Sequence, residues 1–267
     1  MIRNFIIIMA FSFCSGLAFS QSGPAYKKGT FYAFWGWNKD AYTNSTIHFK
    51  GNDYDFTLDK VKASDKQNKW SYRDYLQLDR ITIPQTNFRL GYFLKDNLAI
   101  TLGVDHMKYV MDQDQTVDLS GTVRPAYQSM VNPDNTIKLT PEFLKFEHTD
   151  GLNYINSEVE YYRNVYSKGI LRVNGFVGGG AGFLLPRTNA TLMGEQRHDA
   201  FHLSGFGLSA KLGVNVDLWN LFFLRAEGKE GYINMPDIRT TYSSSDKAKQ
   251  AFFFAEFVYA FGFHLHI

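Results

Sequence analysis

The end of the chain alternates without a break between apolar and other residues. Successive side chains of a β-strand point to opposite faces, so this pattern predicts a long strand with one apolar face. Such a strand turns that face inward in a soluble sandwich or barrel, and outward to lipid in a membrane barrel. One parity carries Phe253, Ala255, Phe257, Tyr259, Phe261, Phe263, Leu265 and Ile267, and the other includes Glu256, Gly262 and His264.

Seven earlier segments show the same period, whereas clean helical periodicity is rare. Together the eight segments are approximately residues 29–38, 86–94, 98–111, 152–165, 170–186, 201–218, 221–234 and 250–267. The connections between them alternate between short (95–97, 166–169, 219–220) and long (39–85, 112–151, 187–200, 235–249). Short turns at one end and long loops at the other are typical of outer-membrane barrels. The pattern therefore favours the membrane barrel over the soluble sandwich.

The predicted fold is an all-β, antiparallel, up-and-down, eight-stranded transmembrane β-barrel with long extracellular loops. Backbone groups in lipid find no water to bond to, so a sheet that spans a membrane must close on itself. We expect residues 21–267 to form this single domain in the bacterial outer membrane, with both ends of the chain on the periplasmic side. Its expected surroundings are outer-membrane lipid and lipopolysaccharide.

The first twenty residues have the features of a signal peptide. A short positive start with Arg3 precedes an apolar stretch, and Ala18-Phe19-Ser20 gives the small-x-small pattern of a cleavage site. Cleavage removes the single cysteine, Cys14, and leaves 27 Lys and Arg against 26 Asp and Glu. A disulfide framework is then excluded. The near-neutral balance also argues against nucleic acid as a partner.

The architecture resembles the small outer-membrane barrels typified by the membrane domain of OmpA, OmpX and OmpW. The closing segment, residues 259–267, is similar to the C-terminal pattern that the barrel-assembly machinery recognises, although it ends in Ile267 where Phe is usual. This resemblance implies insertion by that machinery. The overall style suggests a porin-like envelope protein of the Bacteroidetes type.

Ten charged residues fall on the polar parity of the strands and are expected to share the lumen. They are Arg89, Asp105, Glu158, Glu160, Arg172, Lys211, Arg225, Glu227, Lys229 and Glu256. An eight-stranded lumen is just wide enough for side chains to fill it, so these groups should pair and plug it. A narrow proton or ion path is the functional alternative to this structural ion-pair core.

One motif resembles a catalytic pair. His202 and Ser204 lie two residues apart, with parity facing lipid, as in the lipid A deacylase PagL, an eight-stranded barrel with His, Ser and Glu on its lipid face. A serine hydrolase also needs an acid that orients the His. Glu230 shares the outward parity, but pairing through the turn at 219–220 places it roughly opposite Ser209, away from the pair. We therefore expect a polar position near the membrane interface.

No metal site and no cofactor are expected. Asp105 and His106 are neighbours and point to opposite faces, and His264 with His266 lacks a third ligand. The run Gly178-Gly179-Gly180 is not followed by a helix, so it is better interpreted as a curved or closely packed strand than as a phosphate loop.

Three functions remain open on the sequence. The first is a non-enzymatic envelope protein whose long outer loops bind a ligand, which the sequence does not name, or support surface integrity. The second is a lipid-modifying enzyme of the deacylase type, favoured by an acid beside His202. The third is an OmpW-like conduit for small hydrophobic molecules, favoured by an apolar lateral opening.

Overall fold

The computed structural model describes residues 23–77, 84–195 and 198–266. The expected signal peptide, residues 1–20, lies outside the described residues. Within the described ranges, no helix is both long enough and apolar enough to cross a membrane.

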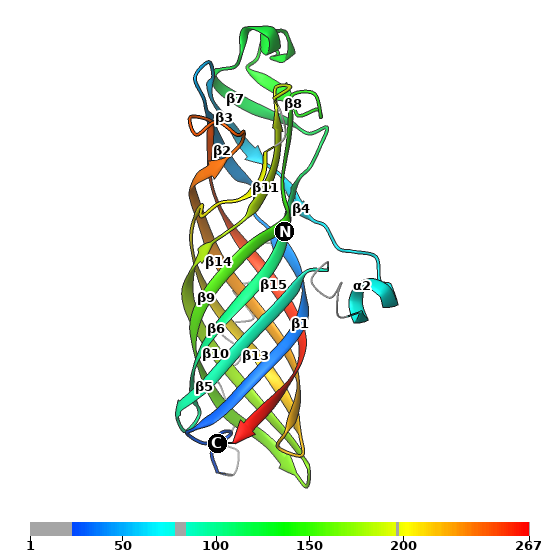
Figure 1. Ribbon diagram of the computed structural model, residues 1–267, viewed down its shortest axis with the longest axis vertical. Helices are drawn as coiled ribbons and strands as arrows, with labels where there is room; N and C mark the ends of the chain where they lie inside the picture. The colour runs from blue at the N-terminus through cyan, green and yellow to red at the C-terminus, as the bar shows by residue number, and fades with distance from the viewer. Residues whose placement is uncertain (1–22, 78–83, 196–197, 267) are drawn as a thin grey trace.

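Eight long antiparallel strands form a closed ring, drawn as a tall cylinder in Figure 1. They are β1 (Thr30–Tyr42), β5 (Thr86–Lys95), β6 (Leu98–Met111), β9 (Leu144–Lys168), β10 (Leu171–Leu184), β13 (Gly205–Leu218), β14 (Phe222–Arg239) and β15 (Lys247–His266). Each strand pairs with the next in this order, and β1 closes the ring by pairing with β15 from Thr30↔His266 to Tyr42↔Phe254. The predicted antiparallel strand order is confirmed.

Three tight turns gather at one end of the ring, here called the turn end. They join β5 to β6, β9 to β10 and β13 to β14. Asn97 and Gly169 adopt positive φ angles of 66° and 59° in the first two turns. Glycine and asparagine tolerate this left-handed backbone best, so these residues fix the positions of the turns.

At the other end, the long connections fold into further strands. They contain β2 (Ser45–Lys50), β3 (Asp55–Val61), β4 (Ala63–Asp65), α2 (Tyr72–Leu76), β7 (Thr116–Thr122), the 3-10 helix η2 (Pro125–Met130), β8 (Thr136–Lys138), β11 (Arg187–Leu192) and β12 (His198–Phe201). Strands β2, β3, β7 and β8 continue the sheet from β15 in that order, β11 pairs with β9 and β12, and β4 pairs with β6. These short strands, with the far ends of β6, β9, β14 and β15, form a body that we call the extension (Figure 1).

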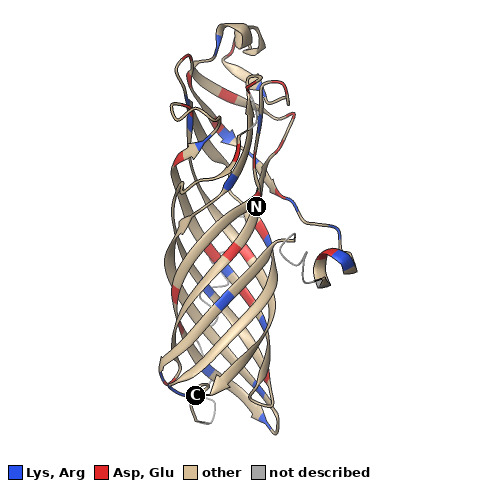
Figure 2. Cartoon of the chain, in the orientation of Figure 1, with Lys and Arg blue, Asp and Glu red and all other residues tan. Residues whose placement is uncertain are grey.

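The interior changes character along each long strand. On β14, the inward side chains are Arg225, Glu227 and Lys229 in the middle of the ring, and Ile233 and Met235 farther toward the extension. Buried and exposed positions keep alternating along the strand, but the inward side chains change from charged to apolar. The extension thus has a conventional apolar core, whereas the middle of the ring is polar inside and apolar outside. Figure 2 shows charged residues on the strands in the middle of the ring.

Aromatic side chains dominate the core of the extension. Phe49, Phe56, Phe143 and Phe146 are fully buried there and contact one another as rings. Burying one such ring contributes roughly 1.5–3 kcal/mol. Where the long connections pack on this core, they are therefore ordered strands and not irregular loops.

Candidate functional site: the polar interior of the ring

Nine buried charged side chains form a layer across the middle of the ring, here called the charged layer. They come from six strands: Arg89, Asp105, Glu158, Glu160, Lys211, Arg225, Glu227, Lys229 and Glu256. Each is at most 5% exposed. Burial of so many charges is costly unless every charge has a partner, so their contacts decide what the layer can do.

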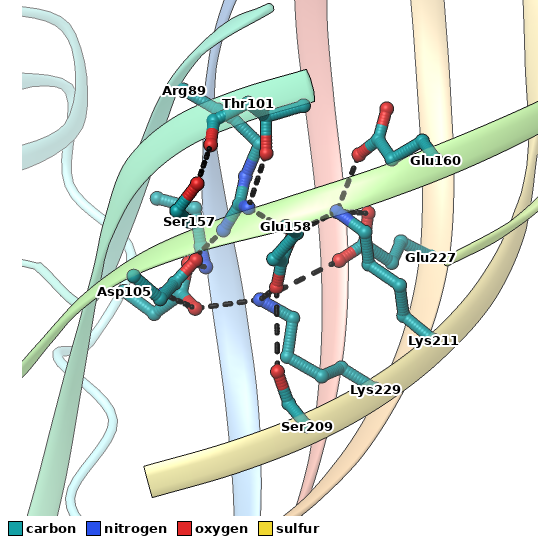
Figure 3. A network of polar contacts seen from close by, with 12 residues as sticks. Arg89, Thr101, Asp105, Ser157, Glu158, Glu160, Ser209, Lys211, Glu227 and Lys229 are labelled. Atoms are coloured by element: carbon teal, nitrogen blue, oxygen red, sulfur yellow. Dashed lines mark hydrogen bonds and ion pairs between the residues drawn. The ribbon is translucent and has the colours of Figure 1, made fainter. Parts of the chain in front are cut away.

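The cations of the charged layer each contact more than one carboxylate, and Figure 3 shows these contacts for Arg89, Lys211 and Lys229. Lys229 Nζ lies 2.6 Å from Asp105 Oδ2 and 3.0 Å from Glu158 Oε1. Arg89 pairs with the same two carboxylates, and its Nη2 lies 3.0 Å from Asp105 Oδ1. The shared carboxylates join strands β5, β6, β9 and β14 into one network.

The second half of the charged layer is built around Glu160. Arg225 Nη2 lies 2.9 Å from Glu160 Oε1 and 2.6 Å from Glu227 Oε2. Lys211 Nζ lies 2.5 Å from Glu160 Oε1 and also pairs with Glu158. Glu158 thereby connects the two halves, so the layer crosses the ring without a break.

Glycines on β10 provide the space that these side chains occupy. A Cβ atom at Gly178 would lie 3.2 Å from Glu160 Cγ and 3.3 Å from Lys211 Cε. At Gly180 it would overlap the Ser157 carbonyl oxygen and lie 2.8 Å from Glu158 Cγ. The glycine run thus lies against the charged layer, in keeping with the closely packed strand expected from the sequence.

An aromatic plug fills the ring between the charged layer and the turn end; it consists of Tyr26, Tyr32, Phe93, Tyr162, Phe176 and Phe223. Tyr32 and Tyr162 donate hydrogen bonds to Glu160 Oε2 and connect the plug to the charged layer. Tyr26, which precedes β1, lies inside the ring and donates to both carboxylate oxygens of Asp217, at 2.9 and 2.8 Å. Aromatic, charged and apolar layers therefore succeed one another along the interior from the turn end to the extension.

Arg172 does not belong to the charged layer, which corrects the sequence-based expectation. Its guanidinium donates to the carbonyl oxygens of Pro24 and Ala25 and to the side chain of Asn220. Arg172 is the second residue of β10, so it lies at the rim of the turn end, beyond the reach of the central carboxylates. Without Arg172, the charged layer holds four cations and five carboxylates. The side-chain amide of Asn87 adds two hydrogen bonds to these carboxylates, because it donates to Glu256 Oε1 at 2.9 Å and to Asp105 Oδ1 at 2.8 Å.

His202 and Ser204 lie in the connection between β12 and β13, before the strand that was expected to carry them. Ser204 is 2% exposed and its Oγ donates to the His202 carbonyl oxygen at 3.2 Å, so the expected lipid-facing position is wrong for this residue. The His202 ring instead contacts Asp237, with Nε2 2.9 Å from Oδ2.

Asp237 is the acid that the sequence did not identify beside His202. Partial burial acts to raise the pKa of Asp237, but hydrogen bonds from Lys247 and His202 outweigh it and hold this pKa below its usual value. Lys247 Nζ lies 2.9 Å from Asp237 Oδ1. The contact could not be found by strand parity, because a bulge in the β14–β15 pairing between Met235 and Ile238 changes the register beside Asp237.

The other histidines that were weighed as ligands have protein partners. His264 Nε2 lies 3.0 Å from Asp217 Oδ1, His266 Nδ1 lies 3.1 Å from Thr30 Oγ1, and His106 Nδ1 lies 2.8 Å from Asn153 Oδ1. Within residues 23–77, 84–195 and 198–266, no three His, Cys, Asp or Glu side chains are grouped to hold a metal ion.

Known proteins resemble this chain in structure only. No family model matches it, and no curated protein does. The outer membrane protein OprG from Pseudomonas aeruginosa has 11% identity and a TM-score of 0.44, covering 91% of this chain and 98% of its own. The outer membrane protein AlkL has 11% identity and a TM-score of 0.42, covering 95% and 98%. Neisserial surface protein A has 13% identity and a TM-score of 0.38, covering 88% and 99%. Because these identities and TM-scores are low, the fold is assigned from the strand pairing of this chain and not from its likeness to these proteins.

Proposed function

We propose that this chain is a non-enzymatic outer-membrane β-barrel whose extension carries a structural or surface-binding role outside the cell. The observation that supports this proposal most strongly is the exchange of faces along the long strands. In the ring, charges lie inside and apolar side chains outside; in the extension, the order is that of a water-soluble domain. Both observations are explained if each long strand passes from lipid in the ring into water in the extension.

The outer surface of the ring supports a lipid environment. Its exposed apolar side chains include Leu102, Val177, Leu212, Leu224, Phe253 and Phe261, each between 52% and 61% exposed. Soluble monomers rarely expose contiguous apolar surface on this scale. The closed pairing of the eight strands also leaves no open sheet edge, as a membrane span requires.

The filled interior supports a closed barrel and argues against a conduit. The charged layer and the aromatic plug occupy the lumen, and β14 pairs with β13 and β15 residue by residue throughout the ring. On β2 and β3, the side chains that face away from the core of the extension are polar or charged, among them Thr46, Lys50 and Asp55. These polar side chains make the surface suitable for contact with water-soluble partners.

Two measurements test the proposal. Single cysteines at Lys66 and Asp134, both in the connections at the extension end, should react with a membrane-impermeant maleimide on intact cells. Labelling only after permeabilisation would contradict the proposed orientation. In planar bilayers, the purified protein should show no stable conductance, whereas porin-sized steps would contradict the closed lumen.

A second candidate, a lipid A-modifying enzyme of the deacylase type, is favoured by the His202–Asp237 contact alone. The buried Ser204 hydroxyl, which bonds to a backbone carbonyl, supports the non-enzymatic proposal instead. Mass spectrometry of lipid A from cells that express the wild type or Ser204→Ala separates the two. A deacylated species that disappears in the variant, with folding unchanged, would favour the enzyme.

A further inference from the structure

One carboxylate lies on the apolar outer face of the ring. Glu230 on β14 points outward and is exposed, with Ala210 of β13 and Ala255 of β15 as its register partners. Among the described residues, Glu230 has no hydrogen bond or ion pair. A carboxylate on a lipid-facing surface is unfavourable unless it reaches the interface or meets a donor, so its position requires an explanation.

The outer wall is hollowed at Glu230. The hollow has a volume of about 520 Å³ and spans strands β1, β13, β14 and β15. Small residues, Ala41, Ala210 and Ala255, leave it open, while Tyr232 and Phe253 border it. The paired strands continue beneath it from Phe222↔Phe263 to Met235↔Gln250, so the hollow lies on the wall and does not lead into the lumen.

Small outward residues of β14 continue from the hollow toward the turn end, and we call this line of small residues the furrow. The outward positions of β14 below Glu230 are Gly228 and Ala226. A Cβ atom at Gly228 would meet nothing within 4 Å. On either side of Gly228, the outward side chains of Leu212 and Phe257 are 56% and 52% exposed. The furrow is therefore apolar, one strand wide, and ends at a carboxylate.

The hollow lies where the apolar surface gives way to polar residues. Tyr232 and Phe253 are in ring contact at 5.1 Å, and beyond them the outward positions are Asn234 on β14 and Lys249 on β15. Aromatic residues of this kind mark the edge of the hydrocarbon layer. Lys39, an outward cation on β1, lies on the far side of β15 at the level of Phe257.

We propose that this hollow and furrow bind a membrane lipid that carries a primary ammonium group on its headgroup. The ammonium group donates hydrogen bonds to Glu230, one acyl chain lies in the furrow over Gly228, and Lys39 meets the phosphate. Charge complementarity selects this occupant: an anionic headgroup would place a second negative charge at Glu230, and a quaternary ammonium group has no N–H to donate. This binding site is independent of whatever the extension binds.

The test is lipid retention measured by native mass spectrometry on the purified, folded protein. Phosphatidylethanolamine, phosphatidylcholine and phosphatidylglycerol with identical acyl chains are offered at equal concentration. A charge-assisted hydrogen bond is worth enough to favour phosphatidylethanolamine by about tenfold. Glu230→Gln should abolish this preference, and Gly228→Val should reduce retention of all three lipids by filling the furrow.

Arg163→Gln is the matched control, since Arg163 is an exposed charged residue on β9, outside the hollow. It should keep the preference of the wild type, and heat-modifiable mobility should show that every variant is folded. Equal retention of the three lipids by the wild type would overturn the proposal. So would a preference that survives Glu230→Gln, or a dimer of the chain that retains no lipid.

Discussion

Individual buried charges are where this fold is most sensitive to substitution. Lys229 contacts carboxylates from β6 and β9, so it joins strands that are not neighbours of β14. Replacing it with methionine keeps much of the volume and leaves Asp105 and Glu158 with one cation fewer. An uncompensated buried charge costs about 3–5 kcal/mol.

We therefore expect Lys229→Met to lower the free energy of unfolding by about that amount. Urea unfolding of the protein in detergent micelles, followed by tryptophan emission, measures it. Lys249→Met is the control, because Lys249 is exposed on the outward face of β15, and should change stability by less than about 0.5 kcal/mol. Equal effects of the two substitutions would show that the charged layer does not stabilise the fold.

His148 gives the extension a dependence on pH. Its ring is fully buried between Tyr109 and Phe146, and Nδ1 lies 2.9 Å from Thr188 Oγ1. Burial lowers the pKa of His148 to about 4, against a smaller opposing effect of a hydrogen bond with Gln250. In the unfolded chain the imidazole takes up a proton near pH 6.5.

The unfolded state thus binds the proton first, and stability falls as the pH drops from about 6.5 toward 4, by about 3 kcal/mol in all. Above pH 6.5 the imidazole is neutral in both states and this loss is absent. Unfolding of the wild type and of His148→Gln, compared at pH 7.5 and 4.5, isolates the effect. The variant should show the shallower pH dependence, and identical slopes would contradict the assignment.

Sequence parity places nine of the ten expected lumen charges on the inward face, where the structure has them. It fails for Arg172, because parity gives the face of a residue and not its height along the ring. It also misses Tyr26, which precedes the first strand, and Asp237, which follows a bulge. Parity carries no information where the chain is not a regular strand.

At the scale of whole strands, β10 shows how backbone shape makes room for the charged layer. Gly180 faces inward, where any Cβ atom would contact the Ser157 carbonyl oxygen and the Glu158 side chain. Gly180→Val should separate β9 from β10 and destabilise the fold by more than about 3 kcal/mol. Heat-modifiable electrophoresis and circular dichroism measure the folded fraction.

Gly228→Val provides the comparison for Gly180→Val. Gly228 faces outward on β14, with open space where its Cβ atom would lie. Its substitution by a residue with higher β propensity should leave folding unchanged. Poor folding of both variants would show that glycine is needed for strand flexibility and not for space inside the ring.

The elements of the ring could be predicted from sequence, while those of the extension could not. Long uninterrupted alternation, as in β13 and β15, leaves one choice of face and predicts a strand directly. Strands such as β4 and β8 have three residues each, too few to show a period. In addition, β9 begins at Leu144, eight residues before the expected start, because its inward residues change there from polar to apolar.

In the proposed function, one sheet faces lipid along the ring and water along the extension. The middle of the molecule has apolar side chains outside and charges inside, and its far end has an aromatic core inside. Depth-dependent quenching tests this account most directly. Single cysteines at Phe261, Phe257, Phe253 and Lys249 follow the outward face of β15 from the ring into the extension. Each carries a bimane label, in vesicles with or without brominated acyl chains.

Bimane at Phe261 and Phe257 should be strongly quenched by brominated lipid, bimane at Phe253 less so, and bimane at Lys249 not at all. This gradient follows from a lipid boundary near Tyr232 and Phe253. Uniform quenching along the strand, or none at any of the four positions, would contradict a membrane-spanning ring that continues into a water-exposed extension.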